Sequence, residues 1–512
     1  MFVKRRWVVL LVGCGALALL APAIVQADSV VQDVSNTLTR PEGEESLAVN
    51  PINTNNILVG ANQIPSQEVT SFPNPSEANA PCGLWVSHDG GATWSVVNLP
   101  GFGQGADQSV VFDRHGTAYY ACDQLLGIGG VGGIVVWRSA DGGDHWTGPV
   151  TAAATLDSDG HLIDRPFLAV DTSGGPRDGT VYVGWESFFT EPISAVYLRS
   201  STDGGQHWGA VTRPDGADFP SMIDPRQYPA VDANGTVYVE YVAGLGNSPA
   251  LPPVSPMSIV VARSHDGGAT FQRTAVDGHV VRGGSPQEAT AFFLETIAAI
   301  ATDPRRPGHV AVAWPDARSG ESRIVLSDSV DGGVTWTVPL DIADDPAGHG
   351  NQHDHVAIAY APDGRIGAIW RDHRDSGGGF TTPFGIFARM VSVGSAGELT
   401  PGTAVRMSTS PQPTANCIPC EYFAAAAGPD GLSAAWEEMR GANADAVFRR
   451  LPLSALGTQA TMATPVIAAG QPLPDTSAGP GQAALGTLGI ALLLLASVLA
   501  LLRPRRRGKT PA

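Results

Sequence analysis

Three segments of the chain repeat the pattern Trp-x-acid-x-Arg, which places a carboxylate two residues before a guanidinium. They are Trp314 to Arg318, Trp370 to Arg374 and Trp436 to Arg440. Side chains two residues apart on a strand lie on the same face, so each Arg can pair with its own acid, and the sequence favours this interpretation. The alternative is that Arg318, Arg374 and Arg440 together clamp an anionic ligand.

A second group of ionisable residues precedes apolar strands at intervals along the chain. We expect each to enter an innermost strand of the fold, where residues from distant segments converge on one ligand. The group consists of Asp107, Asp164, Arg165, Arg226, Glu295, Asp354 and Glu421. The simpler interpretation is that the arginines pair with neighbouring acids, Arg165 with Asp164 and Arg226 with Asp224.

Histidines near Asp354 raise the question of a metal site. On a regular strand, His353 and His355 point to one side and Asp354 to the other, so one ion would not be held by all three. We therefore predict no metal and no cofactor. Lys4 and Lys509 are the two lysines of the chain and lie near its ends, which excludes Schiff-base chemistry and a phosphate-binding P-loop from the body.

Seven strand-turn-strand units could position these residues. Units of roughly 60 residues predict an all-β propeller of seven four-stranded antiparallel blades over residues 28–453, with six blades as the alternative. We expect residues 30–38 to supply the missing outer strand of the last blade. The units are Leu47 to Gly60, Val110 to Ala121, Phe167 to Trp185, Ala230 to Tyr241, Ile297 to Trp314, Val356 to Trp370 and Phe423 to Trp436.

Five copies of Ser-x-Asp-Gly-Gly-x-x-[Trp/Phe] support the same architecture. In this motif the Asp accepts backbone N–H groups and the Gly pair supplies positive φ, which predicts a tight turn. The motif resembles the Asp-box, or BNR repeat, of sialidase-like β-propellers. In that family the box is structural and lies away from the ligand face, so we expect the site on the opposite face. The five acids are Asp89, Asp141, Asp203, Asp266 and Asp331.

The resemblance extends to sialidase catalysis only in fragments. Sialidases bind the substrate carboxylate with three arginines and use a Tyr nucleophile activated by Glu, with an Asp as acid/base. Tyr422 beside Glu421 resembles the nucleophile, Glu295 its activating group and Asp107 the acid/base. The Tyr-Arg-Ile-Pro type motif of the first blade is absent, and Arg165 is its nearest counterpart. The simpler interpretation is that Tyr422 packs at a strand start while the acids cap turns.

The two ends of the chain predict export at the N-terminus and anchoring at the C-terminus. Lys4-Arg5-Arg6 and an apolar run predict a signal peptide over residues 1–27, with a lipoprotein signal at Cys14 as the alternative. Residues 454–482 read as a stalk, 483–502 as a transmembrane helix and 503–512 as a basic cytoplasmic tail. The stalk contains Leu473-Pro-Asp-Thr-Ser477, which resembles the LPxTG sorting motif but has Ser477 where that motif has Gly. We therefore favour retention in the membrane, with sortase as a partner and cell-wall anchoring as the alternative.

Four cysteines fall within the predicted exported body. In an oxidising compartment the simplest pairing joins Cys82 to Cys122 and Cys417 to Cys420. Without the eight basic residues of the two ends, the chain has 23 basic and 49 acidic residues. This negative body argues against nucleic-acid binding.

We therefore expect a cell-surface propeller that recognises a glycan or protein ligand at the mouth of its central channel. The alternatives are an exo-sialidase or other glycoside hydrolase, and an assembly or scaffold factor.

Overall fold

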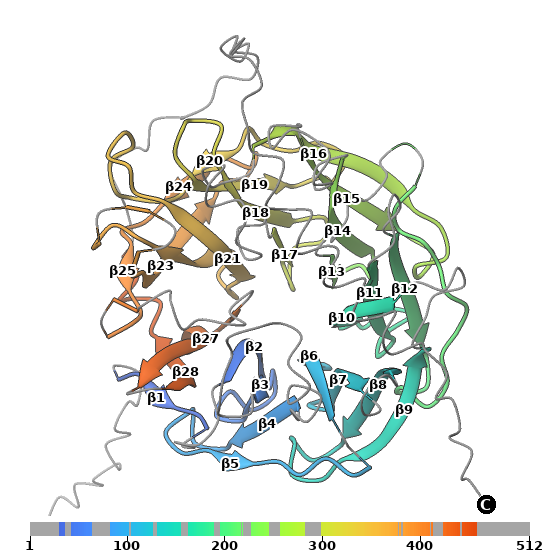
Figure 1. Cartoon of the computed structure of the whole chain (residues 1–512). Coiled ribbons are helices and arrows are strands. Elements are labelled where there is room, and N and C mark those ends of the chain that lie inside the picture. Colours follow the sequence, from blue (N-terminus) through green and yellow to red (C-terminus); the bar gives the residue numbers. More distant parts are fainter. Residues whose placement is uncertain are drawn as a thin grey trace, which may run out of the picture.

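The protein is a seven-bladed β-propeller whose sheets surround one central axis (Figure 1). The computed structural model describes strands and turns, with no helix, in residues 30–35, 42–63, 82–101, 104–125, 131–154, 162–188, 195–216, 218, 227–244, 257–281, 298–376, 378–379, 382–409, 411–412, 423–440 and 443–457. The sequence prediction of an all-β propeller with seven blades is confirmed, and the six-bladed alternative is wrong.

The first three blades follow the chain from inside to outside, each strand pairing antiparallel with the next. Blade 1 consists of β2 (Glu42–Val49), β3 (Ile57–Gln63), β4 (Cys82–Ser87) and β5 (Ser95–Val96). Blade 2 consists of β6 (Gln104–Phe112), β7 (Ala118–Leu125), β8 (Val131–Ser139) and β9 (Thr147–Ala153). Blade 3 consists of β10 (Leu162–Val170), β11 (Val181–Phe188) and β12 (Ala195–Ser201), and Thr212 bridges to its outer strand.

The next three blades repeat the arrangement. Blade 4 consists of β13 (Tyr228–Val231), β14 (Val237–Ala243), β15 (Met257–Ser264) and β16 (Gln272–Val280). Blade 5 consists of β17 (Ala299–Thr302), β18 (Val310–Asp316), β19 (Arg323–Ser329) and β20 (Leu340–Asp341). Blade 6 consists of β21 (His353–Tyr360), β22 (Ile366–Asp372), β23 (Gly385–Val393), β24 (Leu399–Pro401) and β25 (Val405–Arg406).

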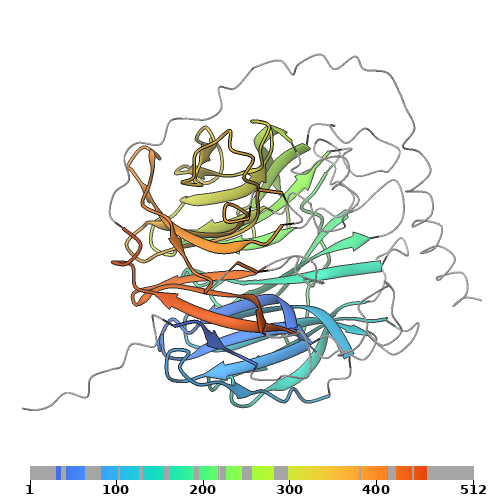
Figure 2. The same ribbon diagram turned by 60° about the vertical axis from the view of Figure 1, so that its left-hand side comes forward.

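Blade 7 closes the ring with strands from both ends of the described chain. It consists of β26 (Ala424–Gly428), β27 (Gly431–Arg440), β28 (Asn443–Leu451) and, outermost, β1 (Gln32–Asp33). The blue β1 lies beside the red β28 in Figures 1 and 2. Val34, which follows β1, donates its N–H to the Ala446 carbonyl at 2.9 Å. The expectation that residues 30–38 complete the last blade is confirmed.

Apolar packing between neighbouring blades forms the core. Seven clusters of buried side chains lie in the described body, and each joins two adjacent sheets. Large aromatic residues on the second and third strands fill these layers, because alternate residues of a strand face the neighbouring sheet. The tryptophans in these layers with under 2% exposure are Trp85, Trp137, Trp314, Trp370 and Trp436.

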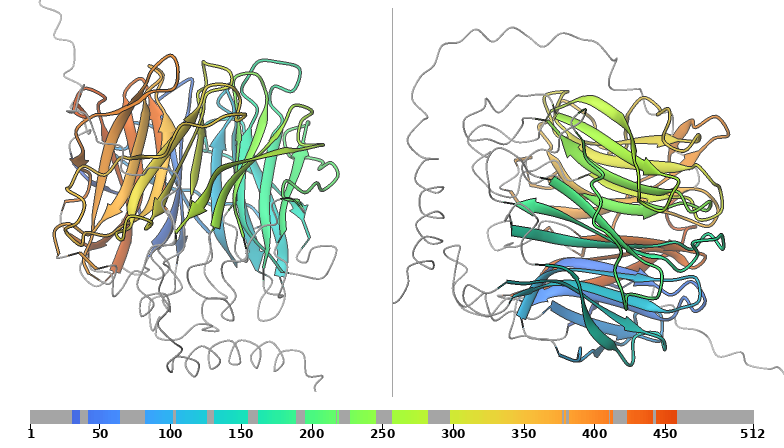
Figure 3. Two further views of the ribbon diagram at one scale, coloured as in Figure 1. Left: turned by 90° about the horizontal axis from the view of Figure 1, so that it is seen from above. Right: turned by 90° about the vertical axis from the view of Figure 1, so that its right-hand side faces the viewer.

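The five repeated Ser-x-Asp-Gly-Gly segments fold into one type of turn. In each copy the Ser hydroxyl donates to the Asp carboxylate at 2.7–2.9 Å and accepts a Gly N–H at 2.8–2.9 Å. The first turn of blade 1 contacts these turns, since Asn55 accepts from Gly90 and Asn56 donates to Gly142. First turns and repeated turns therefore share one face, as strand alternation predicts. Figure 3 shows the sheets side by side around the ring.

Cys82 and Cys122 form a disulfide that joins β4 to β7. Cys417 and Cys420 lie outside the described residues, as do the predicted signal peptide, sorting motif, transmembrane span and tail. Within the part of the chain that is described, no helix has the length and apolar character needed to cross a bilayer.

Because β1 closes the ring, we predict that a charged substitution affects the free energy of unfolding very differently at two valines near β1. Val34 is 1% exposed between blades 7 and 1, whereas Val30 is 59% exposed. Val34→Asp buries an unpaired charge and should lower the free energy of unfolding by about 3 kcal/mol or more. Val30→Asp should change it by less than about 0.5 kcal/mol. Denaturant unfolding checks both, and equal effects would show that β1 does not close the ring.

Candidate functional site

The inner strands of four blades carry a β-bulge at one equivalent place near the strand start. One extra residue interrupts the pairing of β2, β6, β10 and β21 with their second strands. The bulged residues adopt φ values of 60° at Glu44, 52° at Asp107, 53° at Arg165 and 46° at His355. Positive φ is uncommon for residues other than Gly, and bulges re-aim side chains near functional sites. The position is therefore a strong candidate for function.

Buried glutamines fasten two of these bulges to the next blade. Gln108 donates its amide N–H to the Glu44 carbonyl, and Gln227 donates to the Arg165 carbonyl at 3.0 Å. Both glutamines are fully buried. Each bond thus satisfies the carbonyl of a residue held in a sparsely populated conformation.

The second strands of the same four blades contribute one polar residue each at a matching position. Asn62, Asp123, Glu186 and Arg371 pair across the sheet with the residue that precedes the bulge. Glu437 follows Trp436 as Arg371 follows Trp370, and lies at the same point of blade 7. Together with the bulges they form what we term the axial cluster: Glu44, Glu45, Asn62, Asp107, Asp123, Asp164, Arg165, Glu186, Asp354, His355, Arg371 and Glu437.

Three carboxylates of the axial cluster lie close together in blades 2 and 3. One oxygen from each of Asp107, Asp123 and Asp164 lies within 4.8 Å of the others. Burial and then the Asp107 charge raise the pKa of Asp164 to about 8. Burial, with Asp164 and Asp107 nearby, raises the pKa of Asp123 well above its ordinary value. The structure thus brings the predicted residues Asp107 and Asp164 into one group.

Arg165 lies beside these acids as part of a buried ion pair. Its guanidinium is 2.7 Å from the Glu186 carboxylate and 3.9 Å from that of Asp164. The predicted pairing of Arg165 with Asp164 is therefore the longer contact, and Glu186 is the closer partner. A fully buried carboxylate at hydrogen-bond distance balances the Arg165 charge.

The blades 6, 7 and 1 side of the axial cluster is centred on Asp354. Its carboxylate forms an ion pair with the Arg371 guanidinium at 2.8 Å and hydrogen bonds with His355 at 2.9 Å and His373 at 3.1 Å. Burial alone would raise the pKa of Asp354, but Arg371 and His355 hold it well below its usual range. Next to this group, burial and the Glu437 charge raise the pKa of Glu45 well above normal.

The acids and arginines that define the three Trp-x-acid-x-Arg segments lie away from the axial cluster, whereas Arg371 and Glu437, each between the Trp and the acid, belong to it. Arg318 contacts Asp316 and, at 2.7 Å, Asp277 of β16. Asp316 also accepts from the Trp314 indole at 3.0 Å, and Asp372 does so from Trp370. Arg374 pairs with Asp372 at 2.6 Å and Asp344 at 2.7 Å, whereas Arg440 lies 3.8 Å from Asp33. The contacts of Arg318 and Arg374 match the pairing interpretation.

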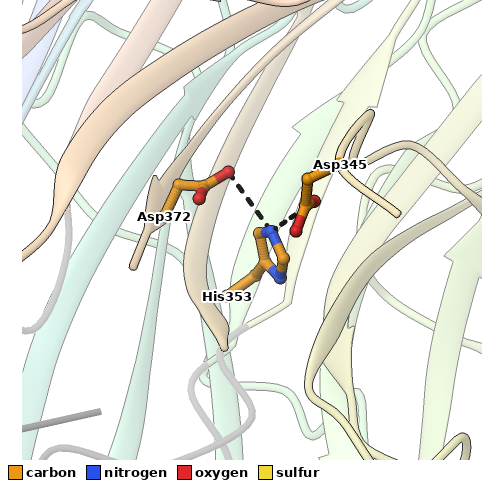
Figure 4. Close-up of side chains that lie close together, drawn as sticks. All are labelled: Asp345, His353 and Asp372. Atoms are coloured by element: carbon orange, nitrogen blue, oxygen red, sulfur yellow. Dashed lines mark ion pairs between the residues drawn. The ribbon is translucent and has the colours of Figure 1, made fainter. Parts of the chain in front are cut away.

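A separate buried network joins blades 5 and 6 around His353 (Figure 4). The His353 Nε2 atom is 3.0 Å from Asp345 and 3.2 Å from Asp372, and Nδ1 is 2.9 Å from the Ser322 carbonyl. Acceptors at both ring nitrogens favour the imidazolium ion. Burial opposes this charge, but the hydrogen bonds to Asp345 and Asp372 raise the pKa of His353 to about 9.

The prediction that His353 and His355 point to one side of the strand and Asp354 to the other is wrong. The bulge between Asp354 and Val356 shifts the register, so that His355 contacts Asp354 while His353 faces another network.

Several residues of the axial cluster were not predicted from the sequence. Asp123, Glu186, Arg371 and Glu437 each come directly after the Cys or Trp that ends a mostly apolar stretch of the second strand. The Trp-x-acid-x-Arg pattern drew attention to the acid one position later, which faces the other way. Strand alternation, applied to the residue between the Trp and the acid, would have predicted that this residue faces the axis.

Four predicted site residues fall in gaps of the described chain. They are Arg226, Glu295, Glu421 and Tyr422. Of the described ones, Asp107, Asp164, Arg165 and Asp354 belong to the axial cluster, and Arg318, Arg374 and Arg440 do not.

Comparison with known proteins finds related sequences only at low identity. No protein-family model matches the chain. A xyloglucanase from Paenibacillus sp. is 24% identical over 319 residues, covering 58% of this chain and 26% of the relative. A xyloglucanase from Hypocrea jecorina is 27% identical over 275 residues, covering 49% and 28%. The chain spans only about a quarter of the length of these curated relatives.

Solved structures with a similar fold include sialidases and a glycoside hydrolase. The Ruminococcus gnavus intramolecular trans-sialidase has a TM-score of 0.42 and 13% identity, covering 85% of this chain and all of its own. The Hadza microbial sialidase Hz136 has a TM-score of 0.41 and 13% identity, covering 73% and 74%. The Niastella koreensis GH74 enzyme has a TM-score of 0.39 and 15% identity, covering 78% and 64%.

The His353 network predicts a pH-dependent stability. Its folded pKa of about 9 lies above the unfolded value of 6.5, so its contribution is complete below pH 6.5 and is lost as pH rises toward 9. Relative to His353→Gln, the wild type should lose on the order of 3 kcal/mol of unfolding free energy between pH 6.5 and 9.

Denaturant titrations at each pH measure this difference, with His145→Gln as the control because that side chain is 89% exposed. A constant gap between wild type and His353→Gln would show that His353 is neutral in the folded protein.

Proposed function

We propose that the protein recognises a neutral, hydroxyl-rich glycan at the axial cluster. One observation carries this proposal: eight of the twelve side chains that define the cluster are carboxylic acids, and its two arginines are ion-paired with Glu186 and Asp354. Carboxylates accept hydrogen bonds from sugar hydroxyls, whereas excess negative charge disfavours an anionic ligand. The cluster therefore suits a neutral glycan better than a sialoside, whose carboxylate requires available guanidinium groups.

Glycan hydrolysis is the second candidate function. Glycosidases use two carboxyl groups on either side of the scissile bond, and Asp107 and Asp164 lie close together in the axial cluster. The curated relatives with 24% and 27% identity carry the name xyloglucanase, which is compatible with a neutral polysaccharide. A scaffold role has less support, because polar groups converge at the axis.

Binding to a defined set of glycans tests the proposed function. The full chain, purified in detergent, is titrated with xyloglucan oligosaccharides and, in parallel, with sialyllactose. We expect binding to the neutral glycan alone and a loss of at least about tenfold in Asp107→Asn, as for removal of a charged hydrogen-bond acceptor. Asp144→Asn, an exposed change on the repeated-turn face, should bind normally.

Release of reducing ends from xyloglucan, abolished in Asp164→Asn, would extend the function to hydrolysis. Tight binding or turnover of sialyllactose would refute the preference for a neutral ligand.

We further propose that the body is displayed outside the cell and held by residues 483–502. The signal-like first 27 residues, the uncharged segment and the basic tail support this arrangement. The Cys82–Cys122 disulfide suits an oxidising compartment. Truncation after residue 482 should move the protein from the membrane fraction to the medium. Retention of the truncated chain in the membrane would instead favour the lipoprotein signal at Cys14, and sortase processing would shorten the wild-type chain at the stalk.

A further inference from the structure

We propose that Asp107, Asp123 and Asp164 bind a divalent cation of the calcium class. These residues come from β6, β7 and β10, which belong to two neighbouring blades. One carboxylate oxygen from each lies within 4.8 Å of the other two, so a single ion placed among them would contact all three. This site was not predicted from the sequence, because its members are 16 and 41 residues apart and match no metal-binding motif.

An unsatisfied oxygen within the group points independently to a ligand. Asp123 is only 7% exposed, and its Oδ1 atom has no hydrogen-bond donor. Burying a carboxylate oxygen without a donor is costly unless a cation or proton occupies the position. Asp123 faces Asp164 and Asp107, which are both acids. A cation among the three would satisfy this oxygen and offset their mutual repulsion.

The local charge balance also suits a divalent ion. Arg165 is the nearest guanidinium that the structure describes, and the fully buried Glu186 neutralises it at 2.7 Å. When all three are ionised, the aspartates carry a formal charge of −3, which a divalent ion would largely compensate. A donor set of carboxylate oxygens, without Cys or His, selects Ca²⁺ or Mg²⁺ over Zn²⁺.

Calcium fits this site better than magnesium. Mg²⁺ demands near-ideal octahedral geometry, whereas three carboxylates from bulged or neighbouring strand positions meet the looser requirements of Ca²⁺. Ca²⁺ accepts six to eight oxygens in variable arrangements and completes its shell with water. The inference stands without the proposed glycan binding, although a cation here would also offer sites to sugar hydroxyls.

Calcium titration of the full chain tests the site directly. After treatment with EDTA, the protein is titrated with CaCl₂ by calorimetry in the absence of any glycan, and its thermal unfolding is followed with and without CaCl₂. We expect saturable binding of one ion and a rise in Tm, because an ion that binds only the folded state stabilises it. Absence of both the heat and the Tm shift would overturn the proposal.

Variants assign the site to these three residues. Asp123→Asn should weaken Ca²⁺ binding at least tenfold, and Asp144→Asn on the opposite face should bind as the wild type does. If Asp123→Asn fails to fold, the partly exposed Asp107→Asn replaces it, with the same expected loss. Unchanged affinity in a folded Asp107→Asn or Asp123→Asn variant would place the ion elsewhere and refute the assignment.

The calcium and glycan experiments fail independently. Calcium binding without glycan binding would retain the cation site and refute the proposed function. Glycan binding in the presence of EDTA, together with no heat of Ca²⁺ binding, would support the proposed function and refute the cation site.

Discussion

The axial cluster depends on a backbone conformation that its residues adopt at a cost. Glu44, Asp107, Arg165 and His355 have side chains yet hold φ between 46° and 60°, a conformation that costs on the order of 1–3 kcal/mol per residue. The strand pairing on either side of each bulge fixes that geometry, and Gln108 and Gln227 bond two of the carbonyls. The bulge changes the direction of the side chains. Each extra residue turns polar groups toward the axis, in strands whose other side chains are mostly apolar and buried.

Strand alternation separates axial chemistry from structural charge along the second strands. In β22, Arg371 reaches the axial Asp354, while the next residue, Asp372, accepts from Trp370 and Arg374 on the outer side. The corresponding Asp316 in β18 accepts from Trp314 and Arg318 in the same way. These outer contacts tie the strand end to its own blade and to the neighbouring outer strand. This explains why the most visible repeated pattern in the sequence stabilises the fold and the less visible residue beside it lines the axis.

The sequence was sufficient to predict a propeller, because the seven similar units and the strand at 30–38 together supply the strands of a closed ring, although a six-bladed ring remained an alternative. It placed Asp107, Asp164, Arg165 and Asp354 at strand entrances correctly, since a strand start next to the axis is a property of the repeat. It did not predict the bulges, because Gly marks positive φ in a sequence and none of the four bulged residues is Gly. The partner choices that follow from a bulge, such as Glu186 for Arg165, were hidden for the same reason.

The axial cluster is unevenly distributed around the ring. Its second-strand members come from blades 6, 7, 1, 2 and 3, whereas Val242 and Pro315 occupy the matching positions in blades 4 and 5. The seam where β1 completes blade 7 therefore lies in the middle of the polar side. Glu437 of blade 7 and Glu45 of blade 1 influence each other across that seam. Closing the ring thus places two acids that are distant in sequence in one buried group.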